Sequence, residues 1–280
     1  MRLLLTSGGW AWTLGALLMK SSDSFSPKLH RVQRVSLKNA NPFQTFIDQA
    51  GEIFVNISPA STPKVKAGSE YDEDISAATG ILVRATESKA EDGAVVVDAL
   101  LDLEKLQRSK AKVDDSVAAD ILDGLEGAWR LVFTTGTIDM QKKIKGQINY
   151  FPIKAVQCFD AKEMKITNSI YLFGDTPVIK FFGPWSFNPK SRKVEFDFTA
   201  IAVLGLKFDL PKGGAADIGA ATGLGSDNNK ELVSKGKKPF FNWISADSNI
   251  ATARGGGGGL ALWKRDLDME NENSANPSAF

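Results

Sequence analysis

Side chains that could act as nucleophiles, general bases or soft metal ligands are scarce in this chain of 280 residues, which has one cysteine and one histidine. Cys158 is flanked by Val156 and Phe159, a setting typical of an inert, packed thiol rather than of a nucleophile. A single cysteine also excludes an internal disulfide and a cysteine-rich zinc site.

The histidine, His30, lies in an N-terminal region whose composition marks it for removal, so the processed protein would contain none. Without histidine the chain offers neither a Ser–His nor a Cys–His pair and no His-ligated metal. Carboxylate pairs could do acid–base chemistry, yet the acidic runs at 72–74 and 114–115 fall at expected helix caps and surfaces. We therefore expect no catalytic site, no metal site and no cofactor.

Aromatic side chains are the better candidates for a ligand site. Residues 178–187 contain four aromatic side chains within seven positions. One interpretation is core packing, because aromatic residues dominate the buried area of β-proteins. The functional alternative places Phe182 or Trp185 against a carotenoid, a quinone or the edge of a membrane.

The overall charge is balanced, with 34 basic and 33 acidic residues and a formal net charge of +1. The chain as a whole therefore carries no strong field toward nucleic acid or an acidic membrane, and we expect no nucleic-acid partner. The acidic excess within residues 70–126 is interpreted as the solvated outer face of helices.

The N-terminus resembles a two-part targeting sequence. Residues 1–24 form an expected signal peptide, with a basic Arg2, an apolar run and small residues before a possible cleavage site. An uncleaved anchor helix is the alternative. Residues 25–47 are basic and free of acids, as in a transit segment. The pair resembles the plastid address of algae whose plastids lie inside the secretory route, and residues 48–69 are expected to be a linker.

Three apolar stripes with helical spacing predict helices between residues 70 and 126. Asp92 is the expected N-cap of the second helix, and Asp114 precedes the third. The stripes are Ile75, Ala78, Thr79 and Leu82; Val96, Leu100, Leu103 and Leu106; and Val117, Ile121, Leu122 and Leu125.

At Trp129 the apolar period changes from helical to two, with Trp129, Leu131 and Phe133 expected on one face. Residues 193–199 alternate most clearly. The further strand candidates are 148–159, 164–173, 178–187, 201–210, 239–244, 250–254 and 260–265. Eight or nine short strands with no helices expected between them predict an antiparallel barrel or sandwich over residues 127–266.

Three segments are expected to lie outside the strands. Residues 211–238 are rich in small and polar residues and lack aromatics, so they are expected to form a mobile loop. The five glycines at 255–259 are interpreted as a hairpin turn; a phosphate cradle is the alternative, but such a cradle requires a helix to follow. The polar tail 267–280 is expected to be disordered.

Three stretches together resemble the plastid lipid-associated protein, or fibrillin, family. They are 122–135; 146–149 with 166–170 downstream; and 250–255 with 258–265, preceded by Asp247 where members often carry an acid. The resemblance extends from about Ile75 to Arg265. The segment 211–238 and the run of five glycines depart from the family pattern, so the loops at the barrel mouth stay undefined.

The resemblance implies a lipocalin-like, calycin-type barrel preceded by a short helical segment. Residues 127–129 match the Gly-x-Trp of a lipocalin first strand, in which the tryptophan plugs the closed end. Arg254 or Arg265 is then expected to lie over the Trp129 ring. We favour Arg265, which ends the last strand and shares a face with Trp263 by strand parity. In the alternative, both arginines are solvated and Trp129 is an ordinary core residue.

The candidate residues for ligand binding or barrel closure are Trp129, Phe182, Trp185, Asp247, Arg254, Trp263 and Arg265. The resemblance implies a non-catalytic plastid protein that binds an apolar lipid, carotenoid or quinone-like ligand, or coats lipid bodies such as plastoglobules or thylakoid membranes. An assembly or scaffold factor that docks on a thylakoid enzyme or photosystem is the alternative, and an enzyme is the less favoured class. Ligand identity, oligomeric state and a hollow or filled barrel stay open at this stage.

Overall fold

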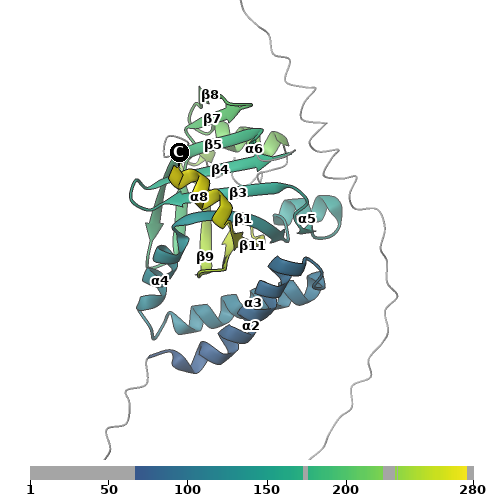
Figure 1. The fold of residues 1–280 in the computed structure, drawn as a ribbon, viewed down its shortest axis with the longest axis vertical. Helices are drawn as coiled ribbons and strands as arrows, with labels where there is room; N and C mark the ends of the chain where they lie inside the picture. The colour runs from purple at the N-terminus through teal and green to yellow at the C-terminus, as the bar shows by residue number, and fades with distance from the viewer. Residues whose placement is uncertain (1–66, 173–175, 223–230, 232, 276–280) are drawn as a thin grey trace, which may run out of the picture. The chain divides into compact units, whose positions relative to one another are not determined.

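The structure is a computed structural model that describes residues 67–172, 176–222, 231 and 233–275 (Figure 1). The expected signal and transit segments, and the linker as far as residue 66, lie outside the described residues.

Four helical elements precede the first strand: η1 (Ser69–Tyr71), α2 (Asp72–Ser88), α3 (Gly93–Lys110) and α4 (Ser116–Leu125). The predicted N-cap is confirmed, since a carboxylate oxygen of Asp92 accepts a hydrogen bond of 2.8 Å from the amide of Ala94. Each of the three α-helices buries residues of its apolar stripe, with Leu82, Leu100 and Leu125 fully buried. The N-terminal helical segment is therefore confirmed.

Eight antiparallel strands close into a barrel in the order β4-β3-β1-β11-β10-β9-β6-β5, and β5 pairs back with β4. Three further strands join this sheet: β2 pairs with β1, β7 with β5, and β8 with β7. The strands are β1 (Gly127–Thr134), β2 (Asn149–Tyr150), β3 (Lys154–Asp160), β4 (Lys165–Tyr171), β5 (Ile179–Asn188), β6 (Lys193–Phe196), β7 (Ala200–Val203), β8 (Leu206–Asp209), β9 (Phe240–Ala246), β10 (Ile250–Gly255) and β11 (Leu260–Arg265). The predicted mainly-β antiparallel barrel is confirmed.

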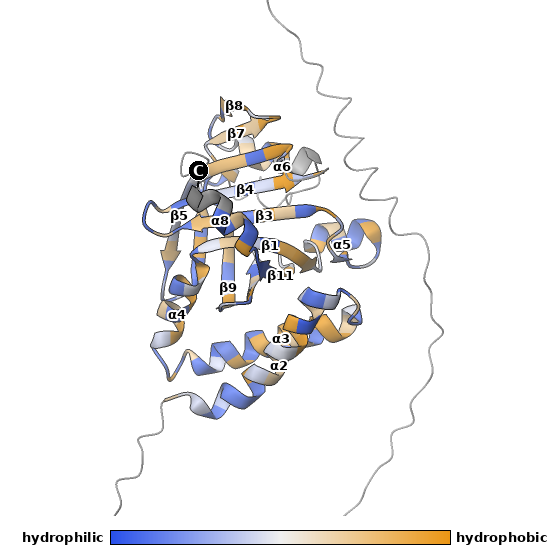
Figure 2. Ribbon diagram, in the orientation of Figure 1, coloured by the Kyte–Doolittle hydropathy of each residue, from blue (hydrophilic) through white to orange (hydrophobic). Residues whose placement is uncertain are grey.

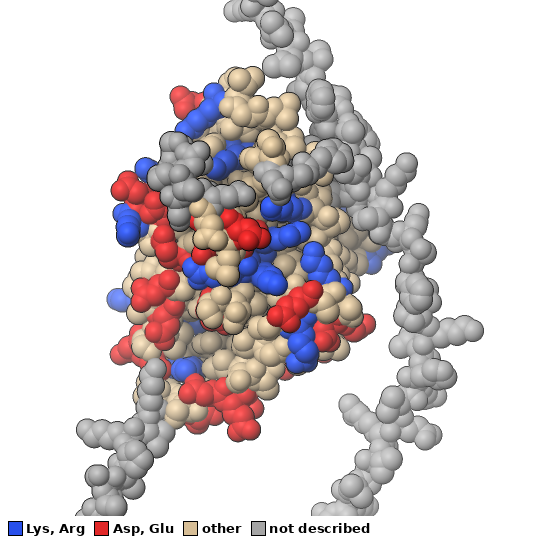
Figure 3. Space-filling model, viewed as in Figure 1, with Lys and Arg blue, Asp and Glu red and all other residues tan. Residues whose placement is uncertain are grey.

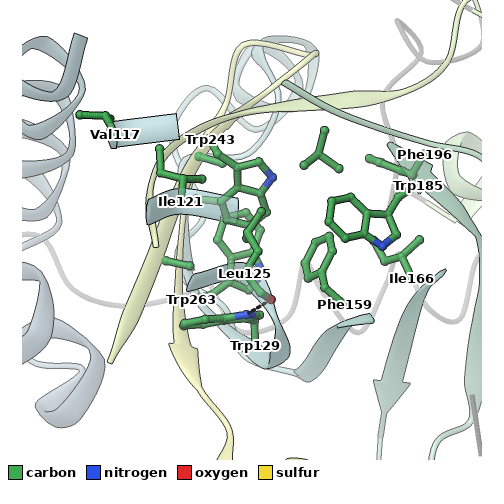
Figure 4. Close-up of a cluster of buried hydrophobic side chains, with 14 residues drawn as sticks. Val117, Ile121, Leu125, Trp129, Phe159, Ile166, Trp185, Phe196, Trp243 and Trp263 are labelled. Carbon is green, nitrogen blue, oxygen red and sulfur yellow. Dashed lines mark hydrogen bonds between the residues drawn. The ribbon is translucent and has the colours of Figure 1, made fainter. Parts of the chain in front are cut away.

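Alternate residues of the strands point inward and form a buried, aromatic-rich cluster, which we call the interior cluster (Figure 4). Three residues of α4 join it: Val117, Ile121 and Leu125. Its buried strand residues are Trp129, Phe159, Ile166, Trp185, Val194, Phe196, Trp243, Ala251, Ala253, Ala261 and Trp263.

The prediction that Trp129, Leu131 and Phe133 share one face is wrong. The pairing of β1 with β11 shifts register between Leu131 and Phe133. Such a bulge inserts one residue and reverses the alternation beyond it. Trp129 therefore belongs to the interior cluster, whereas Phe133 packs outside the barrel with Leu82 and Leu260 beneath α2 and α3.

Two connections expected to lack helices contain them. Helix α5 (Ile138–Ile144) lies between β1 and β2, and the Thr137 hydroxyl caps it by accepting from Met140 N. Helix α6 (Gly214–Thr222) lies within the expected loop 211–238. Its alanines favour a helix without an apolar stripe, so its sequence has no hydrophobic periodicity that would predict it. The loop prediction is wrong for residues 214–222; the mobility of the segment stays a prediction.

The tail and one strand candidate also differ from expectation. Helix α8 (Leu267–Ala275) begins the tail expected to be disordered, and its Met269 is buried against Ala128 and Tyr171. The candidate 201–210 is a hairpin rather than one strand, because Leu204 and Gly205 adopt positive φ angles of 50° and 83° between β7 and β8. These angles match the two-residue turns that hairpins prefer.

The five glycines do form the predicted hairpin turn, since Arg254 pairs with Leu260 across β10 and β11. The turn is packed on both sides. A methyl group on Gly256 would lie 3.1 Å from Phe240, and one on Gly258 would lie 2.5 Å from the Ile138 side chain. Close approach of neighbouring segments of the chain thus accounts for glycine at these two positions.

Candidate functional site

The closed end of the barrel is built around Trp129. Its side chain has no exposed area, and its indole Nε1 donates to the carbonyl of Leu125 at 2.9 Å (Figure 4). Trp129 and Arg265 are direct cross-strand partners, and the guanidinium carbon lies 5.2 Å from the ring centroid. Of the two arginines considered from the sequence, Arg265 therefore makes the cation–π contact.

Helix α8 holds Arg265 in this position. Arg265 Nη2 donates to the carbonyl of Glu126 at 2.9 Å, and its Nε lies 2.8 Å from a carboxylate oxygen of Glu270. The same oxygen accepts from the amide of Ala128 at 3.0 Å. Gly127 has φ 114°, and a Cβ there would lie 2.8 Å from Arg265 Nη2, so only glycine fits beside this ion pair.

Arg254 has a different partner. Its Nε and Nη2 reach the two carboxylate oxygens of Glu104 on α3 at 2.9 and 2.5 Å, and its Nη1 donates to the carbonyl of Gly258 at 2.9 Å. The hydrogen bond with Arg254 lowers the pKa of Glu104 against the opposing effect of burial. This bidentate pair fastens α3 to β10, so Arg254 has a structural role.

Asp247 fixes a turn. One carboxylate oxygen accepts from the amides of Asn249 and Ile250 at 2.7 and 2.9 Å, which fixes the connection between β9 and β10.

The structure places Trp185 and Trp263 in the interior cluster, which favours the core-packing interpretation of Trp185. Trp185 is 4% exposed and meets Phe159 edge to face at 5.4 Å. The ring centroids of Trp263 and Trp243 are 5.1 Å apart. Trp243 is buried; it was expected on a strand but was not among the candidate site residues. The strand alternation around Phe241 and Trp243 is the signal that could have found it.

The interior cluster also contains buried polar atoms. Gln157 lies opposite Trp129 across β1 and β3, and its side-chain oxygen is buried without a hydrogen-bond partner. The same holds for the indole nitrogen of Trp243. These two groups could pair with polar atoms of a bound molecule or of water.

Phe182 points to the opposite, outer face of β5. Lys207 Nζ lies 4.5 Å and Lys180 Nζ 5.3 Å from its ring centroid. Phe182 therefore cannot meet a ligand inside the barrel, and its ring instead supports two ammonium groups.

The inner face of β5 continues beyond the barrel onto β7 and β8, which form the top of the molecule in Figure 1 and are largely apolar in Figure 2. Two cross-strand rows lie on this face, which we call the apolar platform: Ile179, Val203 and Leu206, and Phe181, Ile201 and Phe208. Phe208 is 55% exposed. This platform was not predicted from the sequence, although the apolar run of residues 200–208 was its signal.

Cys158 is not placed as a nucleophile. It is 4% exposed and packs with Val156, Tyr171 and Met269 on the outer face beneath α8. Within the described part of the chain, no three Cys, His, Asp or Glu side chains gather as a possible metal site. None of the described helices combines the length and apolar composition needed to cross a bilayer.

The chain resembles a known family over most of the described fold. The family model PAP_fibrillin matches residues 75–262, from α2 to β11. A search of curated proteins found no match to the chain.

Proposed function

Since the chain belongs to the PAP_fibrillin family, we propose that it binds apolar lipid or an isoprenoid in the plastid and acts at lipid bodies or thylakoid membranes without catalysis. Membership indicates a plastid lipid-associated structural protein, and the family is generally non-catalytic. The ligand class, the sub-plastid location and import by the two-part N-terminus belong to the proposal.

The apolar platform is the observation that supports lipid binding best. The platform is connected to the interior cluster by neighbouring aromatic rings. The ring centroids of Phe196 and Phe198 are 5.3 Å apart, and those of Phe198 and Phe181 are 5.4 Å apart. Phe181 in turn pairs with Ile201 and, one strand further, Phe208. A carotenoid or quinone-like ligand could lie along this face, because aromatic rings and branched side chains suit apolar, extended molecules.

The closed end supports the same assignment. Four tryptophans and two α4 leucine or isoleucine side chains occupy the interior where Trp129 lies, so a ligand would approach from the β5–β7–β8 side. The barrel interior is thus filled by side chains at the Trp129 end, and the apolar platform extends beyond the barrel at β7 and β8.

The test is retention of lipid by the full-length chain. The protein is incubated with a plastid lipid extract, separated by gel filtration and extracted for mass spectrometry. We expect wild type to retain apolar lipid and Phe208→Ser to lose most of it. Leu267→Ser on α8, whose leucine is 62% exposed, is the control for loss of a surface leucine. Equal retention by wild type and Phe208→Ser would count against the platform, and no retention by wild type would count against lipid binding. Capture of a thylakoid enzyme instead would favour the assembly-factor alternative.

A further inference from the structure

We propose that the tip of the β7–β8 hairpin inserts into an anionic lipid surface, with Lys180 and Lys207 contacting the headgroups. The inference rests on the proposed function and adds to it the element that docks and the charge of the surface that it meets. It concerns the end of the hairpin, where Val203 and Leu206, the outermost row of the apolar platform, flank the turn residue Leu204.

The tip exposes three apolar side chains. Leu204 is 73% exposed, Leu206 67% and Val203 38%. A Cβ on Gly205 would have no neighbour within 4 Å, so the turn projects into open space. In Figure 3 the surface at the top, where β7 and β8 lie in Figure 1, is mostly uncharged, with basic and acidic groups at its left edge. A contiguous exposed apolar patch of this kind is typical of an interaction site.

The conformation of Leu204 strengthens this interpretation. Its φ of 50° lies in the left-handed region, which costs most side chains energy and which asparagine or glycine adopts readily. Folding alone would favour Asn-Gly at this two-residue turn. A leucine in this conformation at an exposed turn contributes nothing to the core, which favours a role in a contact outside the folded chain.

The lysines lie one row behind the tip. Strand register places Lys180, Ala202 and Lys207 side by side across β5, β7 and β8, next to the row of Val203 and Leu206. Rows along a strand are about 3.3 Å apart. When the tip enters the acyl boundary, both ammonium groups are therefore at headgroup level, and their flexible stems can extend to reach it.

Charge favours an anionic surface over a neutral one. Lys207 contributes to lowering the pKa of Lys180, after burial, because the two cations repel each other. Anionic headgroups would relieve that repulsion. The carboxylate of Asp209 lies at the opposite end of β8, two residues from Lys207 and away from the tip. The chain's net charge of +1 matters less here than this local pair of cations.

A second copy of the chain fits the hairpin less well. The edge strand β8 has four residues and carries an exposed lysine, and both features discourage pairing of edge strands. The highest exposure also lies at the turn rather than along the strand edge.

The experiment is flotation of the full-length chain with phosphatidylcholine vesicles, with and without phosphatidylglycerol. We expect wild type to float with the anionic vesicles. Burial of one leucine side chain in lipid changes a binding constant by roughly tenfold or more. Leu204→Asn with Leu206→Ser should therefore weaken vesicle binding at least about tenfold. Leu204→Asn alone should weaken it while the denaturant midpoint stays equal or rises, because the turn then contains Asn-Gly.

Two further variants separate charge from apolar contact. Lys180→Gln with Lys207→Gln should bind neutral vesicles as wild type does and lose the preference for phosphatidylglycerol. Leu267→Ser, an equally exposed leucine on α8, should bind as wild type. Three results would overturn the inference. Wild type could fail to float with either kind of vesicle, or the tip variants could float as well as wild type. The third result is a wild-type dimer that the tip variants abolish.

The two proposals fail separately. Leu204→Asn leaves every platform residue unchanged, so a Leu204→Asn protein that keeps its lipid in gel filtration but no longer floats supports the hairpin as the docking element. Wild type that floats through its tip but retains no lipid would refute ligand binding and leave the docking element intact.

Discussion

Replacement of Arg265 by methionine tests the closed end of the barrel most directly. Methionine keeps most of the aliphatic length and removes the charge. The substitution removes the contact of the guanidinium with the fully buried Trp129, the hydrogen bond to the Glu126 carbonyl and the ion pair with Glu270. These interactions involve an Arg265 side chain that is 23% exposed.

The expected loss of stability follows from these contacts. A largely desolvated cation–π contact contributes about 1 to 2 kcal/mol. A hydrogen bond from a charged group adds about 1.5 kcal/mol, reduced here by the partial exposure. The lost contacts are not additive, so we expect Arg265→Met to lower the free energy of unfolding by about 2 kcal/mol. For a domain of this size that corresponds to a decrease of roughly 4–8 °C in Tm.

The assay is denaturant unfolding followed by tryptophan fluorescence. Lys264→Met is the matched control, because Lys264 precedes Arg265 on β11 and is exposed on the opposite face. It should change stability by less than about 0.5 kcal/mol. Glu270→Gln should destabilise wild type and have little further effect in Arg265→Met, since the pair is then already broken. A loss below about 0.5 kcal/mol for Arg265→Met would refute the closure argument.

Four further predictions follow from other parts of the molecule. Arg254 lowers the pKa of Glu104 below its ordinary 4.5, so their ion pair stabilises the fold above pH 4.5. This stabilisation is lost as the pH falls through the lowered pKa. Denaturant midpoints of Arg254→Met should therefore depend less on pH in the acid range than those of wild type. Gly124→Ala should cost about 1–3 kcal/mol in thermal melts, since its methyl would lie 2.5 Å from a β9 carbonyl oxygen. Replacing 211–238 by a short Gly-Ser link should leave Tm nearly unchanged, because none of the described side chains of α6 belongs to a core cluster. N-terminal sequencing of the native protein should find a chain that begins at or after Phe25; an intact Met1 would contradict the targeting interpretation.

Features that depend on near neighbours in sequence were predictable. The helical stripes buried Leu82, Leu100 and Leu125 as expected, because a helix repeats its face every three to four residues. Strand parity put Trp263 and Leu262 on opposite faces, and in the structure Trp263 lies inside the barrel and Leu262 packs beneath the helices. The Asp92 cap and the glycine hairpin were readable for the same reason, since a cap and a two-strand turn involve only a few consecutive residues.

Features that depend on distant segments were decided by tertiary structure. The bulge in β1 that turns Phe133 outward arises in its pairing with β11, about half the chain away. Arg254 meets Glu104 across 150 residues, and Arg265 meets the Glu126 carbonyl across 139. Arg254 and Arg265 lie at the ends of neighbouring strands, yet strand register and the packing of α3 and α8 give them different partners. The local sequence around each arginine does not predict its partner, because these distant residues come together only when the barrel has closed.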